Sequence, residues 1–167
     1  MKRIRRIRKV VTPIDFSDNS KLIADSAGFI AGRFGADLDL VFVVQNFEAY
    51  SGFFVPQLQV PNLEEELVAG AEEKMAEFLG ELTDEFHNLG VGSVASKVLM
   101  GDVGEQIVSY AGEIGADLIV MGTHGYKGLE KVMFGSVADK VVRSALCPVL
   151  TINPYTCCVG TDVADDG

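Results

Sequence analysis

Three glycines and a serine in the second half of this chain have the spacing of a ligand-binding loop. Two residues separate Gly122 from Gly125, nine separate Gly125 from Gly135, and Ser136 follows directly. The apolar run 118–121 before them is typical of a buried strand, and a helical pattern follows them. Glycine allows a ligand to approach the backbone closely. Ser136 is a good helix N-cap, so we expect the free N–H groups of the helix it starts to bind an anion, usually phosphate.

An ordinary strand-to-helix loop, in which the glycines only permit tight turns, is the alternative interpretation. The run has neither the GxxxxGK[ST] order of a Walker loop nor a GxGxxG after its strand. The spacing alone therefore leaves both interpretations open.

Two further side chains lie where they could contact the same ligand. Asp15 ends the first apolar run, where its carboxylate could accept from a ribose hydroxyl or hold a metal ion near phosphate, or could instead cap the following helix. His124 lies inside the glycine loop and could reach ribose or phosphate, or serve as a structural hydrogen-bonding group. No serine or cysteine nucleophile is paired with this histidine.

The glycine loop lies within a regular alternation of predicted strands and helices. Apolar runs predict strands over residues 10–15, 38–44, 94–100, 118–121 and 148–152. Helical spacing predicts helices that end at Phe34 and span 64–89, 105–114 and 134–145, with Val137, Val141, Val142 and Ala145 on the buried side of the last one. Such alternation predicts an α/β fold, a single open, doubly wound parallel sheet that binds ligands beyond the carboxyl ends of its strands.

Composition points to one globular domain without a membrane segment. The 167 residues carry a net charge of −10, and no apolar run reaches the roughly 18 residues that a membrane helix needs. We expect a basic arm over residues 1–8, a domain over 9–154, a tail over 155–167 and a cytoplasmic location. Beyond the six basic residues of the first nine, 8 basic residues face 24 acidic ones, which argues against nucleic-acid binding by the domain.

The order and spacing of these motifs resemble the universal stress protein family, in its ATP-binding subgroup. The resemblance spans roughly residues 8–153 and rests on the Gly-x2-Gly-x9-Gly-Ser pattern after a Val-Met strand and on three further segments, VVTPIDFS at 10–17, GADLIVMG at 115–122 and CPVL at 147–150. It implies a five-stranded parallel sheet in the order 3-2-1-4-5, a Rossmann-like fold of the adenine nucleotide α-hydrolase type. In that order the ends of strands one and four, with Asp15 and Gly122, are neighbours.

The resemblance also implies a cofactor and the residues that contact it. The cofactor is ATP, with AMP or ADP as alternatives, accompanied by Mg²⁺, for which Asp15 is a possible contact through the nucleotide. The backbone of Val43 would meet the adenine edge, and a hydroxyl that the family often carries is missing at Ala138. The full set of implied contacts is Pro13, Ile14, Asp15, Val43, Met121, Gly122, His124, Gly125, Gly135, Ser136, Val137 and Ala138.

By the same resemblance the chain is a stress-response or signalling sensor with little or no hydrolysis of its own and with an unknown protein partner. The family's common dimer mode predicts a homodimer through the last strand, with Val149, Leu150 and Ile152 on an apolar edge. A weak ATPase or phosphotransfer enzyme is one alternative. A nucleotide-free module that binds a partner through the aromatic segment 46–62 or the basic arm is the other.

Overall fold

A single five-stranded parallel sheet forms the centre of the molecule. The computed structural model describes residues 6–45, 62–124 and 135–156. The strands are β1 (Lys9–Pro13), β2 (Asp37–Gln45), β3 (Val94–Gly101), β4 (Leu118–Gly122) and β5 (Val149–Ile152). They pair in the order β3-β2-β1-β4-β5, all parallel. The expected fold class and strand order are confirmed.

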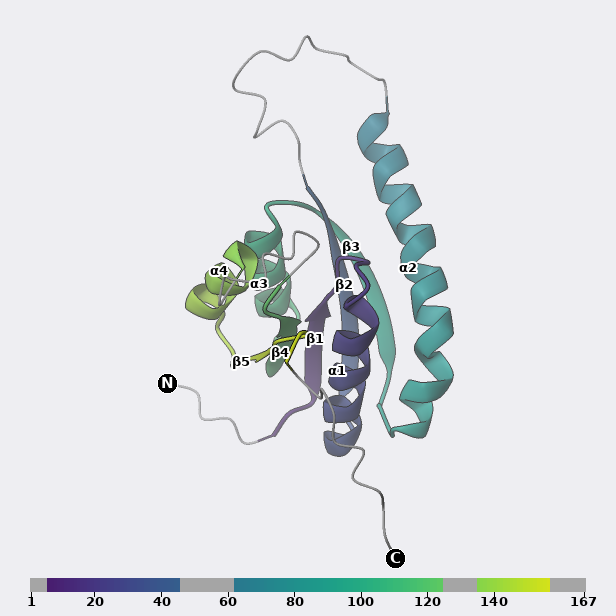
Figure 1. The fold of residues 1–167 in the computed structure, drawn as a ribbon, viewed down its shortest axis with the longest axis vertical. Helices are drawn as coiled ribbons and strands as arrows, with labels where there is room; N and C mark the ends of the chain where they lie inside the picture. Colours follow the sequence, from purple (N-terminus) through teal and green to yellow (C-terminus); the bar gives the residue numbers. More distant parts are fainter. Residues whose placement is uncertain (1–5, 46–61, 125–134, 157–167) are drawn as a thin grey trace, which may run out of the picture.

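Four helices cover the two faces of this sheet (Figure 1). They are α1 (Ser20–Phe34), α2 (Leu63–Asn88), α3 (Val103–Glu113) and α4 (Ser136–Ser144). Residues of α1 and α2 form one buried cluster with the sheet, and residues of α3 and α4 form a second cluster on the opposite face. Because both faces are covered, the central strands are almost entirely apolar, as in Val10, Val11, Ile119 and Val120, which are fully buried.

Helix α1 approaches the end of α2 closely where its own residues are small. Ala24, Ala27 and Ala31 are fully buried there, and Gly28 and Gly32 face the end of α2. A Cβ atom built at Gly28 would lie 2.5 Å from the ring of Phe86, and one at Gly32 only 2.1 Å from the carbonyl oxygen of Leu89. The helix ends as its sequence predicts, at Gly35, whose left-handed backbone has φ 58°.

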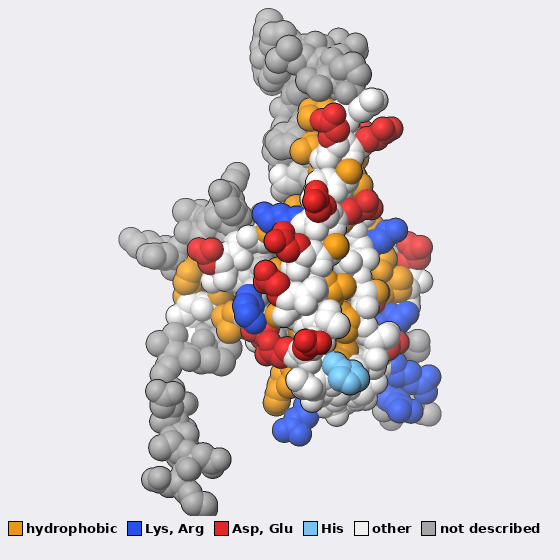
Figure 2. Space-filling model, turned by 90° about the vertical axis from the view of Figure 1, so that its right-hand side faces the viewer, with side chains coloured by type: hydrophobic (Ala, Val, Ile, Leu, Met, Phe, Trp, Pro, Cys, Tyr) orange, Lys and Arg blue, Asp and Glu red, His pale blue; other side chains and the backbone are white. Residues whose placement is uncertain are grey.

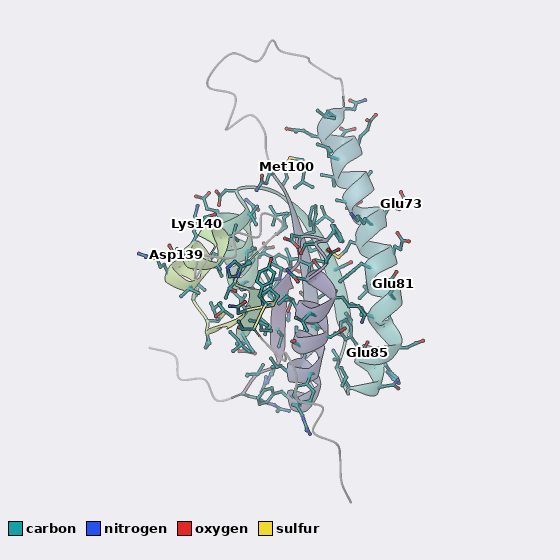
Figure 3. All side chains as sticks on the ribbon, in the orientation of Figure 1. Glu73, Glu81, Glu85, Met100, Asp139 and Lys140 are labelled. Carbon is teal, nitrogen blue, oxygen red and sulfur yellow. The ribbon has the colours of Figure 1, made fainter. Side chains whose placement is uncertain are left out.

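The outer face of α2 is strongly acidic. Figure 2 shows acidic side chains along the length of this helix, and Figure 3 shows Glu73 and Glu81 on its outer side. Glu85 lies toward α1, with its Oε2 3.6 Å from Lys21 Nζ. The buried side of α2 is formed by Ala71, Met75, Leu82 and Phe86. The acidic side chains therefore form a solvated face, and the three glutamates of the first turn suit the positive end of the helix dipole.

The structure differs from the predicted element bounds at several ends. β1 stops at Pro13, so Asp15 lies in the loop beyond the strand instead of at its last position. The predicted burial of Val142 is wrong, since 48% of this side chain is exposed. Within residues 6–45, 62–124 and 135–156, no helix has the length and apolar character needed to cross a membrane.

Candidate functional site

The carboxyl ends of β1 and β4 create the topological switch point of the sheet. β1 pairs with β2 on one side and with β4 on the other. The chain leaves β1 for α1 on one face, whereas it leaves β4 toward α4 on the opposite face, as Figure 1 shows. Connections that diverge to opposite faces leave a crevice between them, and this is where open α/β sheets bind ligands.

Asp15 stands on the β1 side of this crevice, at the centre of a hydrogen-bonded turn. Its Oδ1 accepts from the backbone N–H of Ser17 at 3.0 Å and from the hydroxyl of Ser20 at 3.0 Å. Among the described residues no donor reaches Oδ2. The carboxylate thus orders the turn before α1 through one oxygen, and does not cap the free N–H groups of α1, which was the alternative role considered above. Its second oxygen is available to a ligand.

On the β4 side, backbone hydrogen bonds tie the two ends of the glycine segment together. The Thr123 N–H donates to the carbonyl of Ile152 at 2.8 Å, and the Gly135 N–H donates to the carbonyl of Thr123 at 2.8 Å. A Cβ atom at Gly135 would lie 3.1 Å from that same carbonyl oxygen, and one at Gly122 would lie 3.3 Å from the carbonyl oxygen of His124. At both glycines the absence of a Cβ atom therefore allows a carbonyl oxygen to lie close to the backbone. Gly125 lies outside the described residues.

Helix α4 begins directly behind this closure. The prediction that Ser136 is its N-cap is wrong: Gly135 holds that position with φ −67° and ψ 156°, and Ser136 is the first helical residue. The extended backbone of Gly135 starts the helix one residue before the serine. The first helical bond runs from Asp139 N to Gly135 O at 3.0 Å, so the N–H groups of Ser136, Val137 and Ala138 have no acceptor within the helix. The Ser136 hydroxyl is exposed.

The apolar candidates lie at or near the carboxyl ends of β1, β2 and β4 and at the start of α4. Pro13 ends β1, the Ile14 N–H donates to the carbonyl of Val41 at 2.9 Å, and the Ile14 side chain is buried. Val43 has the same strand parity as Val41 but lies beyond the last β1–β2 pair, Pro13 with Val41. Its backbone groups therefore point toward the space past the end of β1. Met121 and Ala138 are buried with exposed fractions of 4% and 2%, so their side chains contribute only to the core.

His124 follows β4 and is held by its neighbours. Its Nδ1 lies 2.8 Å from Thr123 Oγ1, and its ring packs edge-on against Tyr155 with the centroids 5.4 Å apart. Thr123 is nearly fully buried, whereas Tyr155 is 44% exposed. The histidine is thus a fixed, half-buried group at the mouth of the glycine segment, where either of the roles considered for it is possible.

An ion-pair network fixes α4 to the start of α3. Lys140 Nζ, on α4 and labelled in Figure 3, lies 3.0 Å from Asp102 Oδ1 and 2.9 Å from Glu105 Oε1. Asp102 also caps α3 by accepting from the Glu105 N–H at 2.9 Å. This backbone hydrogen bond, followed by the one from Lys140, lowers the pKa of the Asp102 carboxyl. The network helps to hold the N-terminus of α4 in place, although these solvent-exposed pairs contribute modestly to stability.

A metal site cannot be assigned from the protein side chains alone. In the part of the chain that the structure describes, no three His, Cys, Asp or Glu side chains gather around a common point. Asp15, with its available Oδ2, is the crevice carboxylate that could contact a cation brought in by a nucleotide.

Several residues of this site were not singled out from the sequence. Ser20 donates to Asp15, and both Thr123 and Tyr155 contact His124. No local sequence signal marks these residues. Phe16 belongs to the VVTPIDFS segment at 10–17, but neither composition nor residue spacing indicates its backbone conformation.

Comparison with known proteins agrees with this architecture. The model of the "Universal stress protein family" matches residues 6–153. The "Universal stress protein A homolog 1" of Coxiella burnetii is 32% identical over 146 residues, which cover 87% of this chain and 95% of that protein. Among solved structures, the universal stress protein UspA of Lactobacillus plantarum superposes with a TM-score of 0.74 at 27% identity, over 90% of this chain and all of that one.

A universal stress protein solved in complex with cAMP is also similar in fold. It superposes with a TM-score of 0.61 at 24% identity, and the match covers 89% of this chain and 98% of that one. At this identity the likeness concerns the fold alone.

Proposed function

Because this chain belongs to the universal stress protein family, we propose that it binds an adenine nucleotide in the crevice between β1 and β4. ATP with Mg²⁺ is the expected ligand, and AMP or ADP are the alternatives. The observation that carries the proposal is the glycine-lined start of α4, where three backbone N–H groups lack helical acceptors directly behind the Thr123–Gly135 closure. Such a helix start favours phosphate through both its free donors and its dipole.

Each part of the proposed site has a distinct task. The N–H groups of Ser136, Val137 and Ala138, together with the Ser136 hydroxyl, bind phosphate oxygens, and Gly122 and Gly135 leave room for the phosphate chain. Asp15 accepts from ribose hydroxyls through Oδ2. The backbone of Val43 beyond the end of β1 meets the adenine edge. A universal stress protein of the same fold was solved in complex with cAMP, so this fold is able to hold an adenine nucleotide.

The proposed biological role is that of a cytoplasmic stress-response or signalling sensor with little hydrolysis of its own. Membership of the universal stress protein family supports the stress-response part of this proposal. The sensor acts as a homodimer paired through β5, which is an edge strand with Leu150 42% exposed. Ile152, expected on the same apolar edge, is buried against the α1 side and contributes little to such a surface.

Substitution of Gly135 tests the phosphate site. The Cβ of Gly135→Ala would lie 3.1 Å from the Thr123 carbonyl oxygen and displace the N–H groups that follow. Titration calorimetry with Mg–ATP should give a dissociation constant at least about tenfold higher than that of the wild type, equivalent to one or two phosphate hydrogen bonds. Gly80→Ala, on α2 with no atom within 4 Å of the new Cβ, is the matched control and should bind as the wild type does.

Equal affinities of Gly135→Ala and the control, with both variants folded by circular dichroism, would place the phosphate elsewhere. The N-terminus of α4 would then have a structural role only.

A further inference from the structure

Phe16 has a backbone conformation that bulky residues rarely adopt. It lies between Asp15 and Ser17 with φ 58°, and Asn62 is the other non-glycine residue with positive φ in the described chain. The left-handed region crowds Cβ against the backbone, so a phenylalanine there is a genuine outlier. A strained residue persists only when its surroundings hold it in place.

Three side chains from two other elements hold the Phe16 ring. Its centroid lies 4.6 Å from that of Phe42 on β2, with the rings tilted by 39°, and 6.1 Å from that of Phe78 on α2, nearly perpendicular at 81°. Lys74, also on α2, places its ammonium 4.8 Å from the ring centroid, within the range of a cation–π contact. The ring is thus fixed by the sheet on one side and by α2 on the other.

Phe16 lies in the short part of the turn that makes no hydrogen bonds to the sheet. Before it, Ile14 N–H donates to the carbonyl of Val41 at 2.9 Å, and after it, Ser20 N–H donates to the carbonyl of Ser17 at 2.9 Å. Between these points, the left-handed backbone at Phe16 brings the Ser17 N–H back to within 3.0 Å of Asp15 Oδ1. Together with the Ser20 hydroxyl, which donates to the same Oδ1 at 3.0 Å, the conformation of Phe16 therefore sets the direction of the Asp15 carboxylate.

We infer that Phe16 is a positioning residue of the crevice: its ring, clamped by Phe42, Phe78 and Lys74, holds the left-handed turn that aims Asp15 at the ligand. The inference rests on the proposed function, since it concerns the same nucleotide site. Helix α2, which supplies none of the proposed contacts with the nucleotide, thus sets the fraction of molecules in which Asp15 has its binding geometry. Ligand affinity falls in proportion to that fraction.

A comparison of alanine and glycine at position 16 separates backbone positioning from packing. Both variants lack the ring, but Phe16→Ala keeps a Cβ that disfavours positive φ, whereas Phe16→Gly adopts it freely. The dissociation constant for Mg–ATP, measured by calorimetry, should rise roughly tenfold in Phe16→Ala and only about threefold in Phe16→Gly. A residue that merely fills space would give equal losses, or a larger one for glycine.

A double-mutant cycle tests whether the effect passes through Asp15. In an Asp15→Ala background, Phe16→Ala should change the dissociation constant by less than about twofold, because the group that it positions is absent. Phe78→Leu keeps the bulk under the turn but removes the ring edge, and should weaken binding in the wild-type background alone. Phe29→Ala, which removes a phenylalanine on α1 that is 52% exposed, is the matched control and should leave the affinity unchanged.

The wild-type titration decides the proposed function, and the variants decide the positioning role. A wild type that binds no nucleotide overturns both. If the wild type binds nucleotide, two results overturn the positioning role alone. One is that Phe16→Ala and Phe78→Leu bind with wild-type affinity. The other is that these variants lose the same affinity with and without the Asp15 carboxylate. If Phe16→Ala does not fold, the cycle built on Phe78→Leu gives the same decision.

Discussion

At the scale of single residues, one buried carboxylate shows how a polar group is kept inside this sheet. Asp39 lies on β2 with 9% of its surface exposed, and the hydroxyl of Tyr110 on α3 donates to its Oδ2 at 3.0 Å. Burial is the main reason why the pKa of Tyr110 is raised to about 12, and the hydrogen bond to Asp39 and its charge raise it further. The pair joins α3 to the sheet across 71 positions of sequence.

Removal of the Tyr110 hydroxyl should therefore destabilise the fold. Tyr110→Phe leaves the Asp39 carboxylate buried without this donor, which should lower the free energy of unfolding by about 1–3 kcal/mol near pH 7, as measured by urea denaturation. The folded-state pKa lies above the ordinary value of 10.0. The contribution is thus fully present below pH 10.0 and is lost as the pH rises through about 12.

The difference in free energy of unfolding between wild type and Tyr110→Phe should accordingly become smaller from pH 9 to pH 11. These values lie on either side of the ordinary tyrosine pKa of about 10. Tyr155→Phe, which changes a tyrosine that is 44% exposed, controls for other groups that titrate in this range. A difference that stays constant with pH would contradict the account of this hydrogen bond.

Residue-level features were predictable from the sequence where a local rule applies, and not elsewhere. Gly35 was expected to end α1 because glycine accepts a left-handed backbone, and its φ is 58°. The same φ at Phe16 was not foreseen, since it results from contacts with Phe42 and Phe78 that only the folded chain creates. The Tyr110–Asp39 bond was missed for the same reason.

At the scale of elements, the packing of α1 against α2 depends on the absence of side-chain atoms. A Cβ at Gly32 would meet the Leu89 carbonyl, a backbone group that cannot rotate away. Gly32→Ala should therefore lower the free energy of unfolding by about 1–3 kcal/mol, despite the higher helix propensity of alanine.

The matched variant Gly80→Ala, which introduces its methyl group into open space on α2, should instead raise the free energy of unfolding by about 0.5–1 kcal/mol. Urea denaturation of both variants compares them directly. If Gly32→Ala were as stable as Gly80→Ala, the two helices could not approach as closely as described.

Strands and helices were mostly predictable because burial on both faces gives this sheet continuous apolar runs. The prediction was less accurate at element ends, where two neighbouring residues can fulfil one role. Gly135 takes the N-cap position expected for Ser136, because an extended glycine can begin the helix without any side-chain cap. Leu150 and Ile152 share one face of β5, but only Ile152 is covered by the buried cluster that includes α1. The alternation of residues along a strand predicts the shared face but not this difference in burial.

At the scale of the whole molecule, β5 is an edge of the sheet that carries an exposed leucine. A parallel edge with apolar side chains favours pairing with a second copy. If the proposed dimer uses this edge, Leu150→Lys should convert a dimer to a monomer in sedimentation velocity while the circular dichroism spectrum is retained. Leu67→Lys, on α2 with 39% of the leucine exposed, is the control and should remain dimeric. A monomeric wild type, or a dimeric Leu150→Lys, would exclude this interface.

The N-terminal segment is partly integrated into the molecule. The Ile7 side chain packs against the core cluster of α1 and α2, and the Arg8 N–H donates to Asp117 Oδ2 at 2.9 Å. Positions 1–5 of the basic arm, positions 46–61 of the aromatic segment 46–62, and Cys157 and Cys158 lie outside the described residues.

Native mass spectrometry of the whole purified chain, with and without added Mg–ATP, tests the central proposal most directly. It detects a nucleotide that copurifies as well as one that is added. The crevice between Asp15 and the N-terminus of α4 predicts one adenine nucleotide per chain, with a lower occupancy in Gly135→Ala and an unchanged occupancy in Gly80→Ala. A chain that carries no nucleotide after purification and gains none from excess Mg–ATP would contradict the proposed function.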